Sequence, residues 1–160
     1  MNELKYQPLN ESYANDLLSI WSDEDVIRFT NIKEPCTLQE IKERIQILKP
    51  FDVFVVSNRE GVIGIIGCPC IDKTKSQYGV FYQFRKSSWG KGYATMATEW
   101  LLNFMREKYV DVTFYADVVV DNAASEKILR HFEFDCISEE DEFERNGIKM
   151  KIRNYRLLQC

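Results

Sequence analysis

The feature that most constrains the fold of this chain is a glycine-rich stretch at residues 89–95, with the sequence WGKGYAT. It lies between an apolar run typical of a β-strand, residues 78–85, and a long helical pattern that begins near Tyr93. Two glycines and an alanine at the start of a helix leave several backbone N–H groups unpaired and accessible. Such a turn is suited to bind phosphate or pyrophosphate, although glycines also serve in purely structural turns between a strand and a helix.

Length and composition predict one domain that spans residues 1–160. A chain of 160 residues can bury about 70% of its unfolded surface, and 45% of its residues are hydrophobic. Its uncharged apolar runs are far shorter than the roughly 18–20 residues that cross a membrane. The first five residues lack the basic and apolar regions of a signal peptide. We therefore expect a cytoplasmic protein that does not bind membranes.

Cysteines, histidine and net charge exclude other classes of function. The five cysteines are scattered and odd in number, and His131 is the only histidine. Without a CxxC spacing, this set predicts reduced thiols and no metal site. The net charge of −4 argues against nucleic acid as a partner.

Hydrophobic periodicity predicts the element order β-α-α-α-β-β-β-α-β-α-β-β. The expected strands are residues 4–9, 51–57, 62–71, 78–85, 112–120, 134–144 and 148–158, and the expected helices begin near Asn10 or Ser12, Asp23, Thr37, Tyr93 and Asn122. A dinucleotide-binding Rossmann unit carries its glycine loop after a first parallel strand. Here the loop follows three consecutive strands, and Thr95 occupies the place of the third glycine. The order therefore excludes a Rossmann unit.

This order, together with the glycine loop, resembles the GNAT (Gcn5-related N-acetyltransferase) superfamily. Within it, the chain is most similar to the branch of ribosomal-protein-alanine N-acetyltransferases. The similarity covers nearly the whole chain and rests on residues 4–9 and 22–29, on the loop at 89–95, and on Asn122-Ala123-Ala124-Ser125 with Glu133-Phe134. The resemblance implies an α/β (α+β) fold, with a mixed, mostly antiparallel seven-stranded sheet flanked by helices.

The resemblance also implies a site for acetyl-CoA. The family signature (R/Q)-x-x-G-x-(G/A) falls on Trp89, Gly92 and Ala94, with Trp89 in the place of the usual Arg or Gln. It implies that backbone N–H groups of the loop hold the pyrophosphate, that the strand before the loop pairs with the pantetheine arm, and that the later helix reaches the coenzyme. The candidate coenzyme-binding residues are Tyr82, Gln83, Phe84, Trp89, Gly90, Lys91, Gly92, Tyr93, Ala94, Thr95, Asn122 and Ser125.

The expected reaction is direct attack of an amine on the thioester, which needs an oxyanion donor and a proton for the departing thiolate. The resemblance implies that a backbone N–H near Phe84 is the oxyanion donor. Many relatives supply the proton from a tyrosine at the position of Leu129. The resemblance to this branch implies that Ser125 is used instead, which makes it the candidate general acid here. A serine in the first turn of a helix is also typical of a residue that helps to cap it, and both interpretations stay open.

The sequence contains no clear general base. Asp117, Glu24 and Asp25 are weak candidates, and His131 is more typical of a packed or solvated side chain. Deprotonating a lysine-type amine of pKa about 10.4 at pH 7 costs roughly 4–5 kcal/mol, whereas an α-amine near 7.7–8.0 costs about 1. An α-amine, such as a protein N-terminus, is therefore the easier acceptor.

Other interpretations remain open. The acceptor can instead be a small-molecule amine, such as a polyamine, an antibiotic or an amino acid. Met96, where this branch commonly has Glu, and Leu129 are compatible with a non-catalytic acyl-CoA-binding module. The acidic residues between 139 and 144 either attract a cationic acceptor or form a solvated hairpin. A monomer and a homodimer are both compatible with the sequence.

Overall fold

The computed structural model describes residues 3–158, except for the side chains at positions 140 and 141. The order of helices and strands along the chain agrees with the order that the sequence predicts, and it confirms the α/β fold class. In chain order they are β1 (Lys5–Pro8), η1 (Glu11–Tyr13), α1 (Leu18–Trp21), α2 (Glu24–Ile27), α3 (Leu38–Leu48), β2 (Asp52–Asn58), β3 (Gly61–Cys68), β4 (Cys70–Asp72), β5 (Gln77–Gly79), β6 (Phe81–Phe84), η2 (Lys86–Ser88), α4 (Tyr93–Lys108), β7 (Thr113–Val119), α5 (Ala123–His131), β8 (Asp135–Arg145) and β9 (Ile148–Leu157).

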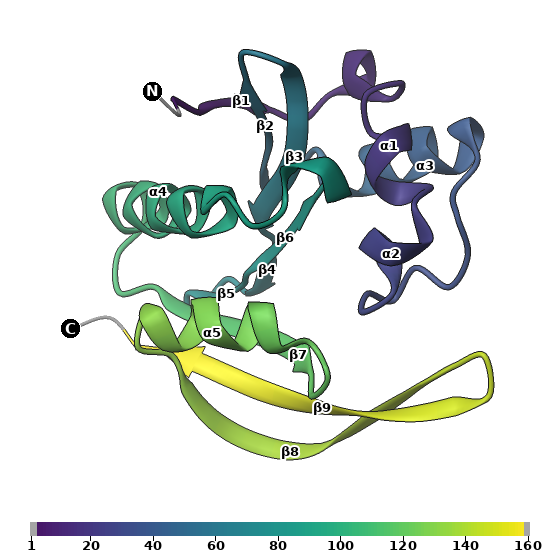
Figure 1. Cartoon of the computed structure of the whole chain (residues 1–160). Coiled ribbons are helices and arrows are strands. Elements are labelled where there is room, and N and C mark those ends of the chain that lie inside the picture. The colour runs from purple at the N-terminus through teal and green to yellow at the C-terminus, as the bar shows by residue number, and fades with distance from the viewer. Residues whose placement is uncertain (1–2, 159–160) are drawn as a thin grey trace.

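The strands form two sheets rather than one continuous sheet (Figure 1). One sheet has the order β1-β2-β3-β6, and the other has the order β4-β5-β7-β9-β8. Two of the predicted strands are each divided into two shorter strands. Residues 62–71 are divided at Pro69 and residues 78–85 at Val80, so the seven predicted strands become nine within residues 3–158. Pro69 has no N–H to continue the ladder. All pairings are antiparallel except the parallel pair of β5 and β7.

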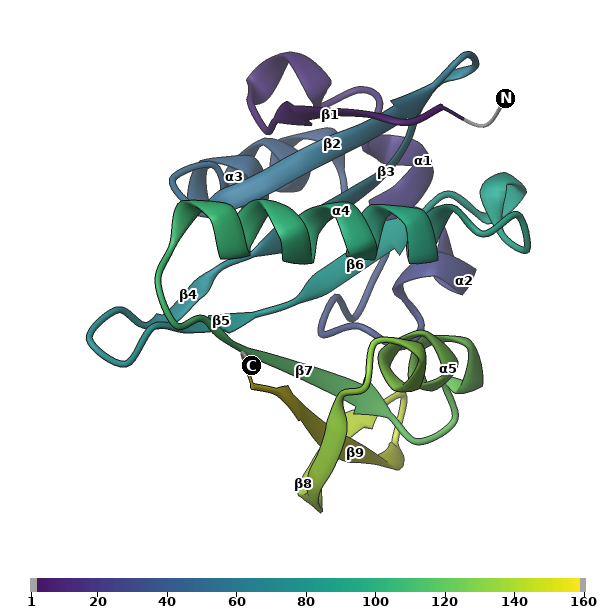
Figure 2. The same ribbon diagram turned by 90° about the vertical axis from the view of Figure 1, so that its left-hand side faces the viewer.

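Helices cover both faces of the first sheet (Figures 1 and 2). α4 lies on one face, while α1, α2 and α3 lie on the other. The alternation of β2 explains this arrangement, because successive side chains of a strand point to opposite faces. Phe54 and Val56 belong to the core beneath α4, and Val53 and Val55 belong to the core beneath α1 to α3. α5 lies against the second sheet and contributes Leu129 to the α4 core.

The N-terminal helices are shorter than the sequence predicts. Asn10 caps only a single 3-10 turn, and turns follow it until α1 begins at Leu18. Asn15 and Asp16, which occupy the interruption, are weak helix formers. α3 begins as predicted at Thr37, whose side chain forms a reciprocal capping box with Glu40. No helix among residues 3–158 has the length and apolar character to cross a membrane.

Candidate functional site

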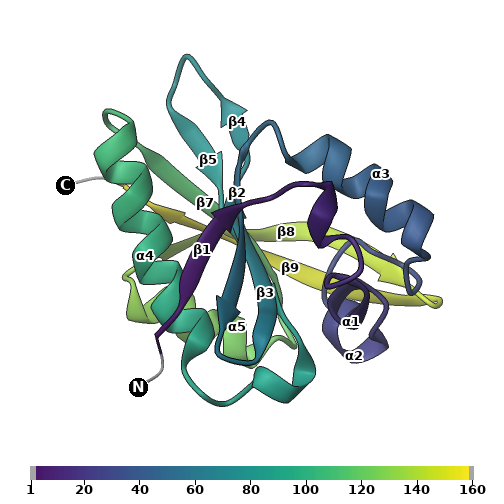
Figure 3. The same ribbon diagram turned by 90° about the horizontal axis from the view of Figure 1, so that it is seen from above.

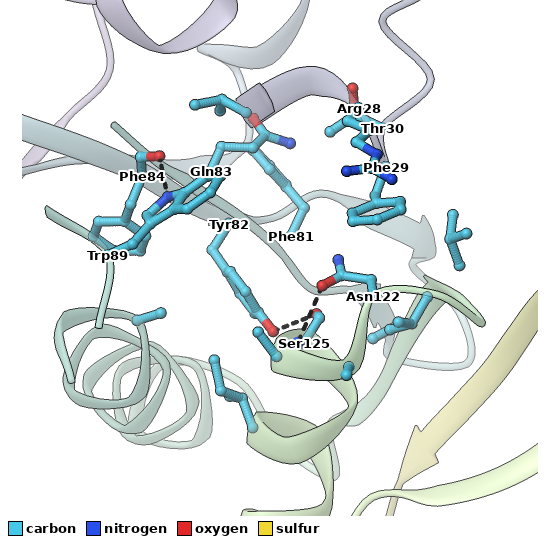
Figure 4. Close-up of a pocket in the computed structure, with 18 of the residues that line it drawn as sticks. Arg28, Phe29, Thr30, Phe81, Tyr82, Gln83, Phe84, Trp89, Asn122 and Ser125 are labelled. Carbon is cyan, nitrogen blue, oxygen red and sulfur yellow. Dashed lines mark hydrogen bonds between the residues drawn. The ribbon is translucent and has the colours of Figure 1, made fainter. Parts of the chain in front are cut away.

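The site is a cavity of about 1040 Å³ between the two sheets. Val80 still donates its N–H to the Tyr115 carbonyl of β7, at 2.7 Å. Beyond Val80, β6 pairs with β3, while β7 pairs with β5 and β9, so β6 and β7 separate. The cavity is lined by these two strands, by the N-terminal turns of α4 and α5, and by the segment that follows α2 (Figure 4).

The backbone of β6 presents donors to this opening. Arg85 donates its N–H to Ile63 of β3 at 2.9 Å, and antiparallel pairing directs alternate residues to the same neighbour. The backbone groups of Tyr82 and Phe84 therefore face the cavity. The Phe84 carbonyl accepts the indole N–H of Trp89 at 2.8 Å, which leaves the Phe84 N–H as the donor on that side.

The glycine loop takes the conformation that its sequence predicts. Gly90 and Gly92 have φ of +76° and +81°, a region that side chains disfavour. A Cβ at either glycine meets no atom within 4 Å, so the backbone conformation and not crowding requires glycine there. Gly92 is the N-cap of α4 and supplies no side-chain cap, which leaves the first N–H groups of the helix open to the cavity.

Most of the predicted loop residues line the cavity, but not all of them do so with their side chains. Trp89, Gly90, Gly92, Tyr93, Ala94 and Thr95 all border it. The Tyr93 ring, however, is buried in the core, and its hydroxyl accepts a hydrogen bond from Asn58 at 3.3 Å. Lys91 is exposed and lies outside the lining. The loop therefore offers backbone N–H groups more than side chains to a bound anion.

Asn122 and Ser125 have separate tasks at the start of α5. The Asn122 side chain caps the helix and accepts the Ser125 N–H at 3.3 Å. The Ser125 hydroxyl is 2.6 Å from the Tyr82 hydroxyl, and either group can donate (Figure 4). Burial raises the pKa of Tyr82 to about 12, although its bond to Ser125 acts in the opposite direction. Tyr82 thus stays protonated at neutral pH.

Sequence reasoning named only Gln83 on the opposite wall of the cavity and missed its other residues. Arg28, Phe29 and Thr30 follow α2 and line it, as does Gln83, whose carboxamide oxygen accepts the Trp21 indole N–H at 2.8 Å. Gln83 was predicted to pair with the coenzyme through its backbone, but it is paired with Ile65 of β3, and its side chain points toward Arg28 and away from Ser125 (Figure 4). Strand alternation agrees with this placement, because it sends the side chains of Tyr82 and Gln83 to opposite faces. No sequence pattern indicated Arg28.

The weak base candidates are largely engaged elsewhere. Glu24 pairs with Arg145 at 2.8 Å, and Asp25 pairs with Lys86 at 2.5 Å. Asp117 lines the cavity and accepts a hydrogen bond from Asn154. His131 lies edge-on to the neighbouring Phe132 ring, outside the lining.

Comparison with known proteins assigns the class. A structure of a ribosomal-protein-alanine N-acetyltransferase from Brucella melitensis superimposes with a TM-score of 0.82 and 16% identity, covering 97% of this chain and 99% of that one. The microcin C7 self-immunity acetyltransferase MccE, solved with acetyl-CoA and AMP, superimposes with a TM-score of 0.85 and 16% identity, covering 99% and 94%. The fold is therefore that of acetyltransferases.

The sequence itself assigns the family. The profile of the acetyltransferase (GNAT) domain matches residues 3–135, and the chain belongs to this family of acyltransferases. An uncharacterized N-acetyltransferase p20 from Bacillus licheniformis is 25% identical over 129 residues, which cover 76% of this chain and 72% of that protein. The resemblance predicted from the loop and the element order is confirmed.

Proposed function

We propose that the protein transfers the acetyl group of acetyl-CoA to a primary amine in a ternary complex. The observation that carries the proposal is the separation of β6 and β7, which opens directly onto the glycine-capped start of α4. A long coenzyme arm fits such an opening, because the strand edge supplies hydrogen bonds and the helix start attracts its phosphates. The MccE structure, which shares this fold, contains acetyl-CoA.

The coenzyme site follows from the exposed backbone. The N–H groups of residues 90–95 hold the pyrophosphate, where the partial positive charge of the α4 N-terminus favours an anion. The backbone of Tyr82 and Phe84 pairs with the pantetheine arm in place of a neighbouring strand. Trp89 takes part indirectly, because its indole N–H ties the loop to the end of β6.

The chemistry requires one bond to form and one to break. The amine nitrogen attacks the thioester carbonyl, and the Phe84 N–H stabilises the oxygen as it becomes negative. The C–S bond then breaks, the nitrogen loses a proton to solvent, and the departing sulfur receives one from the Ser125 hydroxyl. Tyr82, 2.6 Å from Ser125, returns a proton to it and is reprotonated by solvent. The net result is an N-acetyl amine and free coenzyme A.

The acceptor we propose is an α-amine, at a protein N-terminus or on a small molecule. An α-amine is partly neutral at pH 7, so a water molecule suffices to remove its proton. The involvement of the glutamate and aspartate candidates in other contacts agrees with this reading. The cytoplasmic location, the monomeric or dimeric state and the single domain stay predictions.

Calorimetric titration of acetyl-CoA into the wild type and a Gly92→Glu variant tests the proposal. We expect micromolar binding to the wild type and its loss in the variant, whose carboxylate occupies the anion site. Gly147→Glu is the matched control, because Gly147 has φ of +78° and equally open surroundings but lies in the β8–β9 turn. Release of thiol with a panel of amines then reports turnover. A folded wild type that binds no acetyl-CoA contradicts the proposal.

A further inference from the structure

Among the residues that the structure describes, the lining of the cavity contains one cation without an ion-pair partner. The charged residues of the lining are Asp25, Arg28, Lys86, Asp117 and Asp121. Asp25 and Lys86 neutralise each other at 2.5 Å. The exposed Arg28 forms no ion pair within the part of the chain that the structure describes, although its charge adds to the effect of Lys86 in lowering the pKa of Asp25. Its guanidinium lies 5.0 Å from the centre of the Phe29 ring. Its charge is therefore available to a ligand, and the aromatic ring holds it in place.

The segment that carries Arg28 is fixed by hydrogen bonds on both sides. Thr30 donates its N–H and its hydroxyl to the Ile27 carbonyl, at 2.9 and 2.7 Å, and accepts the N–H of Ile32 at 3.1 Å. The carbonyl of the buried Ile32 accepts a hydrogen bond from Arg145 at the tip of the β8–β9 hairpin. Figure 3 shows this hairpin reaching toward α1 and α2. Arg28 is thus presented by a preorganised turn.

Gln83 adds a neutral donor beside this cation. The Trp21 indole can only donate, so the Gln83 oxygen must face it and the amide nitrogen must point away. Trp21 is 1% exposed and fully packed, which fixes this orientation. In Figure 4 the Gln83 amide nitrogen points toward the Arg28 and Phe29 side of the cavity. A guanidinium and an amide N–H therefore lie along one wall.

We propose that this wall binds a carboxylate of the acceptor, so that the preferred substrate is an amine that also carries a carboxylate. The inference rests on the proposed acetyl transfer and adds the class of acceptor. One unpaired guanidinium with a neutral amide donor matches a monoanion better than a doubly charged phosphate. Asp117 and Asp121 add negative charge to the same lining, and this charge suits the amine end of such a molecule. Free amino acids and acidic peptide N-termini share this chemistry.

The test compares matched acceptors in matched variants. The peptide pair is an alanyl-aspartyl and an alanyl-asparaginyl amide, which differ only in one carboxylate, and free alanine and alaninamide form the small-molecule pair. kcat/KM for each is measured with the wild type, Arg28→Gln and Arg28→Glu. Lys42→Gln is the control, because Lys42 is an exposed cation on α3 outside the cavity. For each amine, kcat/KM of the variant is divided by kcat/KM of the wild type, so that differences in the basicity of the amines cancel.

We expect Arg28→Gln to lower kcat/KM about 10-fold for the member of each pair that carries the carboxylate, because one charge-assisted contact is lost. For the other member, kcat/KM should fall by less than about twofold. Arg28→Glu should reverse the preference, and Lys42→Gln should change neither. The pair that responds identifies a free amino acid or a peptide as the acceptor. Equal losses for both members of each pair, or stronger acetylation of phosphoethanolamine than of either pair, overturn the inference.

A binding measurement keeps the two proposals distinguishable. The acetylated forms of the same two peptides are titrated into the protein in the presence of coenzyme A. Tighter binding of the aspartyl product to the wild type, lost in Arg28→Gln, supports the carboxylate site even if no amine is acetylated. Equal binding of both products overturns it, whereas absence of acetyl-CoA binding contradicts only the proposed acetyl transfer.

Discussion

At the scale of single residues, the contact between Tyr82 and Ser125 links β6 of the first sheet to α5, the helix that lies against the second sheet. Sequence reasoning treated Ser125 as either a general acid or a cap, and the structure gives the cap of α5 to Asn122. The Ser125 hydroxyl instead bonds to a phenol on β6, 43 residues earlier in the chain. Tyr82, expected to bind the coenzyme through its backbone, thus also holds the proposed proton donor in position.

Replacing Tyr82 with phenylalanine tests that role. We expect kcat to fall about 10-fold or more, at the lower end of acid–base effects, while acetyl-CoA affinity stays within about twofold. An acetyl thioester with a more acidic thiol should recover much of the loss, because its sulfur needs no proton to leave. Tyr13→Phe, outside the cavity, is the control. An unchanged kcat, or a loss that the better leaving group leaves intact, contradicts the role.

The pH profile offers a second test of Tyr82. Burial raises its pKa from 10.0 to about 12, so the protonated phenol is fully present below pH 10 and is lost only as the pH rises through about 12. In stopped assays of the wild type, kcat should therefore show no falling limb up to pH 10. A decline with a midpoint near 10 that disappears in Tyr82→Phe indicates a phenol with an ordinary pKa.

At the scale of elements, the position of β6 depends on its close fit to β3. Gly64 pairs with Phe84, and a Cβ on Gly64 comes within 2.4 Å of the Phe84 ring and 2.9 Å of the Gln83 carbonyl. Only glycine lets the ring cross β3 at this point. Phe84, whose N–H is the proposed oxyanion donor, is thus held in place by a residue on the neighbouring strand.

Gly64→Ala should therefore disturb both stability and activity. We expect a loss of about 1–3 kcal/mol in the free energy of unfolding, as overpacking of a filled core produces. kcat should fall with it, because Phe84 must shift. Gly79→Ala is the control, since a Cβ there lies 3.6 Å from its nearest neighbour, an ordinary contact. Chemical denaturation measures the difference between the two variants, and equal stabilities contradict the proposed fit.

At the scale of the whole molecule, Arg145 joins the last hairpin to the N-terminal helices. It is 4% exposed and donates to Glu24 and to the Ile32 carbonyl, 121 and 113 residues away. This contact holds the β8–β9 hairpin against the segment after α2, and each of the two contributes a residue to the cavity lining, Phe143 and Asn31. Among the acidic residues of the hairpin, Glu139 pairs with Arg153 and Glu142 and Glu144 are exposed, while the side chains at positions 140 and 141 lie outside the described part of the structure.

Arg145→Met should loosen the attachment of the hairpin to the segment that carries Arg28. It leaves a buried carbonyl without a donor, which costs about 1–3 kcal/mol of unfolding free energy. KM for the acceptor should rise, while calorimetric affinity for acetyl-CoA should stay within about twofold, since the glycine loop is untouched. Lys149→Met, an exposed change on the same hairpin, is the control. A wild-type KM in a destabilised Arg145→Met variant contradicts a role in the acceptor site.

Predictions from sequence succeeded where the signal was local. The glycine loop, the α3 cap at Thr37 and the order of elements follow from conformational preference and periodicity within short stretches. The division of the sheet was missed, because Pro69 and Val80 lie within runs that read as continuous strands. The first helix was overextended because its apolar stripe outweighed the weak helix formers Asn15 and Asp16.

The sequence by itself determined the family, the element order and the glycine turn that opens α4. Each depends on neighbours along the chain, where positive φ and helix ends restrict the residues allowed. Only the tertiary structure decided which side chains meet: Ser125 with Tyr82, Gln83 with Trp21, and Arg145 with Ile32. These contacts join residues 43 to 113 positions apart, and no local preference encodes them, because they exist only once packing of the two cores has fixed the strands and helices in space.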